Sequence, residues 1–113
     1  MKIGVSLYSF HGYKDKLGYK GCIDKVKELG GEGIDISEGP AFATQEEHLT
    51  FAREINEYCK QVGIELCCYC VGSDFINGSG GDLDAEIAKT KLKVDLAEAY
   101  GFKLMRHDAT GGF

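Results

Sequence analysis

Positive charge is scarce in this chain of 113 residues. Its 13 lysines and arginines are outnumbered by 18 aspartates and glutamates, so the net charge is −5. Domains that bind nucleic acids usually carry a basic patch, because they must neutralise phosphates. The charge balance therefore argues against a nucleic-acid partner, although an acidic protein can still bind an anion at one place on its surface.

Long apolar runs are also missing. No stretch approaches the roughly 20 apolar residues that a membrane-spanning helix needs. The first residues, MKIGVSLYSFHG, turn polar after a short apolar run and lack the apolar core and cleavage site of a signal peptide. We therefore expect no membrane segment and a cytoplasmic location.

Cysteines are present, but without the spacing of a zinc site. The sequence contains Cys22, Cys59, Cys67, Cys68 and Cys70. Cys67 and Cys70 stand at a CxxC spacing, but no second such pair accompanies them and no histidine stands at a zinc-ligand spacing. Strand alternation would place Cys67 and Cys68 on opposite faces and would bring Cys68 and Cys70 to the same face. This C-x-C is a weak metal signal, and small buried side chains in a reducing cytosol are the more ordinary interpretation.

Apolar periodicity predicts strands that alternate with helices. Strands are expected at residues 2–10, Gly33–Ser37, 64–71 and from 102 onward. They begin at intervals of about 30 to 40 residues, the length of a strand-helix unit. Such alternation is typical of a parallel sheet with right-handed crossovers. The predicted fold class is α/β, with the order β-α-β-α-β-α-β.

Helix signals separate these strands. Gly18 precedes the first helix, and Thr44 with Glu47 forms a capping-box pattern at the start of the second. The third helix follows a glycine-rich loop at residues 72–81, which we expect to be a flexible lid or linker because it lacks the ending of a phosphate-binding P-loop. Glycines at Gly30, Gly63 and Gly101 are expected to end the three helices.

Two architectures fit this order. A small doubly wound sheet would reverse direction at a switch point. Half of a (β/α)8 TIM barrel would have uniform connections and ligand-binding groups at every strand end. Every predicted strand here does end in polar or aromatic groups, so we expect residues 1–113 to form a single partial domain, the N-terminal half of a barrel.

Several segments together resemble the sugar phosphate isomerase/epimerase family, the xylose isomerase-like TIM-barrel group. The similarity lies in MKIGVSLYSF at the start, GGEGIDIS and GIELCCYCVGSDF at the second and third strands, and GFKLMRHD at the fourth. It covers the whole chain but only the N-terminal half of the family's barrel.

The resemblance implies an enzyme that transfers a proton next to a carbonyl of a sugar or sugar phosphate. It also implies a divalent metal, Mn²⁺, Mg²⁺, Co²⁺ or Zn²⁺, whose ligands in the family come from later strands. Those strands and the acid-base carboxylates are expected to be absent from this chain, which would then be inactive alone. Two alternatives stay open: a small non-catalytic α/β ligand-binding module, and an endonuclease of the same barrel group, which the acidic charge disfavours.

The charged triplet at the fourth strand holds the main candidate site residues. Arg106 could grip a phosphate or carboxylate with its fork of donors, and His107 could act as a catalytic general acid or base. Alternation places Arg106 and Asp108 on one face and His107 on the other. The competing interpretation is that Arg106 pairs with Asp108 or a neighbour and that His107 packs under a helix.

Three further residues are candidates for substrate binding. Asp35 lies between two isoleucines, so it must either face a polar cavity, near substrate or Arg106, or form a structural salt bridge. Tyr8 and Tyr69 lie near strand ends and could form the apolar wall of a sugar site, with ordinary core packing as the alternative.

Half a barrel would also leave its first and fourth strands as open edges. Open edges favour association, so we expect the chain to self-associate.

Overall fold

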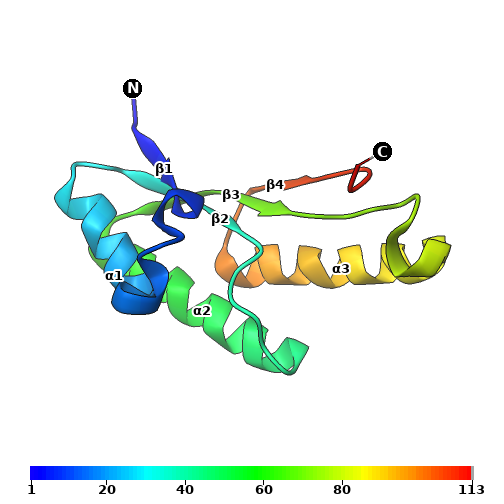
Figure 1. Ribbon diagram of the computed structural model, residues 1–113. Helices are drawn as coiled ribbons and strands as arrows, with labels where there is room; N and C mark the ends of the chain where they lie inside the picture. The colour runs from blue at the N-terminus through cyan, green and yellow to red at the C-terminus, as the bar shows by residue number, and fades with distance from the viewer. Residues whose placement is uncertain (113) are drawn as a thin grey trace.

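The computed structural model describes residues 1–112 as an α/β fold with one parallel sheet (Figure 1). The sheet has four strands in the order β1-β2-β3-β4, which is also their order in the chain. The strands are β1 (Gly4–Ser6), β2 (Gly33–Ser37), β3 (Glu65–Val71) and β4 (Leu104–His107). The helices are α1 (Lys14–Glu28), α2 (Gln45–Val62) and α3 (Leu83–Tyr100), with short 3-10 turns η1 (Leu7–Phe10) and η2 (Gly78–Gly81). The predicted α/β class and the alternating element order are confirmed.

The three helices lie along one face of the sheet, as Figure 1 shows. The chain advances across residues 1–112 in one direction, and the strand order contains no reversal within that range. A doubly wound sheet would reverse and carry helices on both faces. The arrangement is therefore compatible with half of a barrel.

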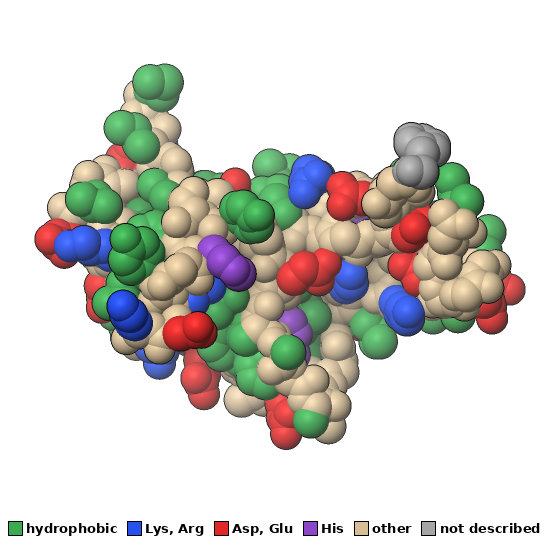
Figure 2. Space-filling view, in the orientation of Figure 1, with side chains coloured by type: hydrophobic (Ala, Val, Ile, Leu, Met, Phe, Trp, Pro, Cys, Tyr) green, Lys and Arg blue, Asp and Glu red, His purple; other side chains and the backbone are tan. Residues whose placement is uncertain are grey.

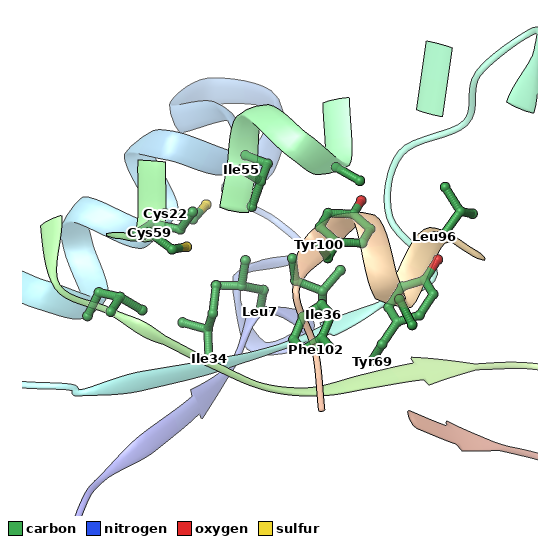
Figure 3. Close-up of a cluster of buried hydrophobic side chains, with 14 of the residues drawn as sticks. Leu7, Cys22, Ile34, Ile36, Ile55, Cys59, Tyr69, Leu96, Tyr100 and Phe102 are labelled. Carbon is green, nitrogen blue, oxygen red and sulfur yellow. The ribbon is translucent and has the colours of Figure 1, made fainter. Parts of the chain in front are cut away.

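The core fills the space between the sheet and the helices (Figure 3). Ile34 and Ile36 of β2 and Tyr69 of β3 are completely buried there. Tyr100, at the end of α3, packs against Tyr69 with ring centroids 5.4 Å apart. Because side chains alternate along a strand, the residues between these buried ones must point to the opposite face, which the helices leave uncovered.

Local capping signals set both ends of α2 and the end of α3 as the sequence predicts, whereas α1 begins at Lys14, before the Gly18 that was expected to precede it. The Thr44 hydroxyl accepts from the Glu47 backbone N–H, and the Glu47 side chain accepts from the Thr44 backbone N–H, which completes the predicted capping box. Gly63 and Gly101 adopt the left-handed conformation, with φ of 76° and 84°, and end α2 and α3. A residue with a Cβ would be strained in this conformation, so glycine is the favoured residue there.

The first strand is shorter than predicted. It covers only Gly4–Ser6, and the chain then turns into η1 because the Ser6 hydroxyl accepts a hydrogen bond from the Tyr8 backbone N–H. This side-chain cap offers the backbone an alternative to the strand ladder. Tyr8 consequently leaves the sheet and is not a strand-end residue in the predicted sense.

A bulge in β3 changes which thiols share a face. Ile34 pairs with Leu66 but Asp35 pairs with Cys68, so Cys67 is the extra residue. A Cβ added at Gly33, on the uncovered face, would lie 2.5 Å from the Cys67 sulfur. Cys67 and Cys68 thus lie on the same face, and the prediction that alternation separates them is wrong, because a bulge interrupts the alternation.

The packing of the core predicts that truncating a buried side chain of α2 lowers the free energy of unfolding strongly. Ile55 is completely buried, so Ile55→Ala should lower the free energy of unfolding by about 2–5 kcal/mol through lost apolar contact and a residual cavity. Ile87→Ala on exposed α3 surface is the matched control and should change it by less than about 0.5 kcal/mol. Urea denaturation followed by circular dichroism measures both, and equal losses would contradict this assignment of the core.

Candidate functional site

The uncovered face of the sheet presents two rows of side chains across the strands. We call it the open face. The strand register places Ser6, Asp35, Cys68 and Leu104 in one row and Ser37, Cys70 and Arg106 in the next. Asp35 and Arg106 are therefore on the same face but separated by β3. The structure brings these two predicted site residues onto one surface with thiols between them.

Asp35 is half-buried on this face, between the buried Ile34 and Ile36. The ion pairs within residues 1–112 do not include it, so the structural salt bridge that the sequence allowed is not formed there. Its charge acts on the neighbouring thiols: burial first, and then the Asp35 carboxylate, raise the pKa of Cys67. Asp35 is left as a carboxylate that can accept hydrogen bonds from a ligand over the open face.

Arg106 and Asp108 form an ion pair at the end of β4. An Arg106 guanidinium nitrogen donates to Asp108 Oδ1 over 3.0 Å, and both side chains are exposed. The predicted pairing of these two residues is confirmed. Contact with the Cys70 thiol and the charge of Asp108 raise the pKa of Arg106, so the guanidinium stays positive. An exposed ion pair is weak, so an anionic ligand could replace Asp108 as the partner of Arg106.

His107 points away from Arg106, as alternation predicts. Its ring lies edge-on against Phe75 of the loop after β3, with centroids 5.6 Å apart. Its Nδ1 is 3.0 Å from the Asp108 backbone oxygen and donates to it in the tautomer that carries a proton there. The imidazole is exposed and packs on a loop residue instead of under a helix.

The two candidate tyrosines lie in different environments. Tyr8 is 69% exposed on η1 and stacks near His11. Tyr69 has no exposed surface: its ring packs between Tyr100 and Phe102, and its hydroxyl donates to the Glu38 backbone oxygen over 2.7 Å. Tyr69 faces the helices, so the structure does not bring it to the open face with Asp35 and Arg106.

Glu38 and Lys93 form a cluster at the strand ends that sequence patterns did not single out. Glu38 directly follows β2 and has a φ of 58°, which is strained for a residue with a Cβ. Its carboxylate accepts from the Gly72 backbone N–H and from Lys93 Nζ, the latter over 3.2 Å. The polar end of β2 was a signal for Glu38. The sequence held no signal for Lys93, because its contact with Glu38 depends on how α3 is rotated against the sheet.

A cavity of about 260 Å³ lies beside this cluster, lined by Glu38, Gln45, His48, Tyr69, Lys89, Leu92, Lys93 and Leu96. Burial lowers the pKa of His48, so the imidazole is neutral near pH 7. Its Nε2 lies 3.1 Å from the Tyr100 hydroxyl. A larger hollow of about 420 Å³ lies between α1 and α2, on the helix side of the molecule and away from the strand ends.

Glu86 of α3 holds the loop after β3. Its carboxylate accepts from the Asp74 backbone N–H over 3.1 Å and from the Ser79 hydroxyl over 2.8 Å, and the residue is 8% exposed. The Phe75 backbone N–H in turn donates to the Ala109 oxygen after β4. The loop expected to be a flexible lid or linker is thus tied both to α3 and to the segment after β4. Figure 2 shows acidic and basic side chains side by side over β4 and α3.

The divalent metal implied by the resemblance does not fit the described side chains. Within residues 1–112, no three histidine, cysteine, aspartate or glutamate side chains are grouped so that they could hold a metal ion. In the same range no helix combines the length and apolarity that crossing a membrane requires.

The Glu86 contacts predict a pH-dependent contribution to stability. The Asp74 backbone N–H and the Ser79 hydroxyl lower the pKa of Glu86 below its ordinary 4.5, so its stabilising effect is present above that pH and is lost as the pH falls through the lowered value. Glu86→Gln should reduce stability at about pH 7, and the gap to wild type should close towards about pH 3. Urea denaturation at both pH values tests this. The exposed Glu98→Gln serves as control, and a gap that does not change with pH would contradict the prediction.

Comparison with known proteins assigns no family to this chain: no protein-family model matches it, and no curated protein matches it.

Proposed function

We propose that this chain is the N-terminal half of a (β/α)8 barrel that binds a sugar or sugar phosphate and takes part in its isomerisation or epimerisation. The observation that carries the proposal is the sequential parallel sheet with helices on one face, which leaves Asp35 and Arg106 together on the other. In a barrel that other face becomes the interior, and ligands bind at the carboxyl ends of the strands. The resemblance to the isomerase/epimerase family supports the same assignment.

The side chains at the strand ends suit a phosphorylated sugar. The Arg106 guanidinium offers paired donors to a phosphate, which would displace the exposed Asp108 carboxylate. The Asp35 carboxylate, which lies two strands away from Arg106, can accept hydrogen bonds from the hydroxyls of the same sugar. Tyr8 is exposed on η1, directly after β1, where its ring could cover an apolar sugar face.

His107 is the proposed proton-transfer group of this half. It is the last residue of β4 and exposed, so it can reach only a ligand that extends over the strand end. An imidazole is the side chain best suited to accept and release a proton near neutral pH. The reaction would move a proton between a carbon next to a carbonyl and this imidazole. No step is assigned to a metal, since the described donor set does not fit one.

A non-catalytic binding module is the second candidate. The specific observation in its favour is the set of polar side chains on the open face. The described residues offer groups that can bind a sugar, but no three metal-ligating side chains are grouped among them. Deuterium exchange, measured also at concentrations where the chain self-associates, tests this choice: transfer of solvent deuterium to the sugar carbon next to the carbonyl would support the isomerase, and sugar binding without such transfer would support the binding module.

Binding through Arg106 is tested by calorimetry with glucose 6-phosphate and with unphosphorylated glucose. Arg106→Ala should weaken binding of glucose 6-phosphate by roughly 10-fold to 100-fold, as expected for loss of a charged hydrogen-bonding partner. The affinity for glucose should stay nearly unchanged. Arg53→Ala on the outer surface of α2 is the matched control. Equal affinities of the two variants for glucose 6-phosphate would refute the site, as would the absence of any sugar binding by wild type.

Self-association through the sheet edges is part of the same proposal. β1 and β4 each have a neighbouring strand on one side only, and Leu104 of β4 is 66% exposed. Unpaired edges with apolar side chains favour pairing with another chain, and a lysine at an edge disfavours it.

We expect light scattering to show an apparent mass that rises with protein concentration. Leu104→Lys should shift this rise to higher concentration. Leu29→Lys should not, because Leu29 lies at the end of α1, away from the sheet edge, and is itself 70% exposed. A monomer at every concentration with one cooperative unfolding transition would be the contrary result.

A further inference from the structure

The thiols of β3 are a group of reactive side chains that the proposed function leaves unused. The bulge after Leu66 brings Cys67 onto the open face together with Cys68 and Cys70. The other two cysteines, Cys22 and Cys59, are buried beneath the helices, with 0% and 1% exposure. The chain therefore separates its thiols into a buried pair and a partly exposed group.

Cys68 and Cys70 are close enough to act on one ion. Their sulfurs are 3.9 Å apart and lie on the same face of a central strand. Two thiolates bound to one tetrahedral ion with metal–sulfur bonds of about 2.3 Å have their sulfurs roughly 3.8 Å apart. The observed separation thus matches an S–metal–S angle near that of a tetrahedral site without movement of the backbone.

The same spacing disfavours a direct sulfur–sulfur bond. Residues two apart on a strand have Cα atoms roughly 6.6 Å apart, near the upper limit for a disulfide, and the sulfurs would have to approach to about 2.0 Å. β3 is paired with β2 on one side and β4 on the other, so its backbone has little freedom to shorten this span. The pair is better placed to chelate an ion than to oxidise.

The charges beside the pair suit a bound dithiolate. Arg106 is the register partner of Cys70, and its guanidinium lies against that thiol. Asp35 is the register partner of Cys68. The guanidinium beside Cys70 stabilises its thiolate, whereas the Asp35 carboxylate disfavours the thiolate of Cys68 unless an ion is bound there.

We propose that Cys68 and Cys70 form a two-sulfur chelating site for a thiophilic d¹⁰ ion such as Zn²⁺ or Cd²⁺. Two S–H bonds are exchanged for two S–metal bonds, two protons pass to solvent, and water completes the coordination of the ion; no electron is transferred. Soft thiolate ligands select such ions over Mg²⁺ or Mn²⁺. The inference is independent of the proposed sugar chemistry. The site requires only two protein ligands, whereas an ion held entirely by the protein requires at least three.

Cadmium is the probe, because sulfur-to-cadmium charge transfer absorbs in the ultraviolet. Titration of the reduced chain with Cd²⁺ should give this absorption with one ion per chain. Cys68→Ser and Cys70→Ser should each weaken binding by more than about 100-fold, beyond the loss expected for a group that only orients a ligand. Cys22→Ala and Cys59→Ala are the controls and should leave the titration unchanged, with circular dichroism confirming that every variant is folded.

Two further results decide the assignment. Bound Cd²⁺ should protect Cys68 and Cys70 from iodoacetamide, as measured by mass spectrometry of peptides, and Cys67→Ser should keep the charge-transfer band. If Cys67→Ser abolishes the band, or if cadmium still binds when Cys68 and Cys70 are both serine, the assigned pair is wrong. Disulfide formation by the pair under a mild oxidant without any Cd²⁺ binding would likewise overturn the proposal.

Discussion

One-sided burial of the sheet is the constraint on which the rest of this structure depends. Ile36 and Tyr69 from the central strands pack beneath Ile55 and Tyr100, and each is fully shielded from water. Complete burial of a large apolar side chain contributes about 1.5–3 kcal/mol, so these contacts fix which face of each strand turns to the helices. The side chains between them must therefore point to the opposite face of the sheet. Asp35 lies on the open face because its neighbours Ile34 and Ile36 are buried in the core, and Arg106 lies there because Met105 before it packs against that core.

The elements that the sequence predicts well are those set by local physics. The Thr44 capping box and the left-handed glycines Gly63 and Gly101 depend on a few adjacent residues, so their patterns can be recognised before the fold is known. Alternation along β2 likewise predicts that Asp35 opposes Ile34 and Ile36. The pairing of Arg106 with Asp108 follows from the same period of two.

The features that escaped prediction depend on contacts between distant parts of the chain. The bulge at Cys67 arises from pairing between two strands, and Glu38 has Lys93 as a partner only because α3 lies over the end of β2. Tyr69 stands at a strand end, as expected, but alternation alone cannot tell which face receives the helices. Its burial is therefore decided by packing. Part of the candidate site follows from sequence, and its surroundings follow from tertiary structure.

The polar groups of α3 explain how the strand ends keep a defined shape. Glu86 accepts from the loop after β3, and Lys93 bridges the Glu38 carboxylate and the Gly72 backbone oxygen. Buried or half-buried charges are costly unless they are paired, so each of these contacts resists opening of the loop. The loop after β3 is in turn bonded to the segment that directly follows Arg106 and His107 of β4.

The order of the open-face residues links the two proposals physically. The thiols of Cys68 and Cys70 stand between Asp35 on β2 and Arg106 on β4. A sugar phosphate that spans from the carboxylate to the guanidinium must pass over these sulfurs, and an ion held by them would occupy part of that path. Because two protons leave as the divalent ion binds, the net charge of this surface would stay the same, while the ion's own ligands would take up space beside the phosphate. Ion and sugar would therefore influence each other through one shared surface, because the β3 thiols and the candidate sugar-binding groups are products of the same one-sided packing.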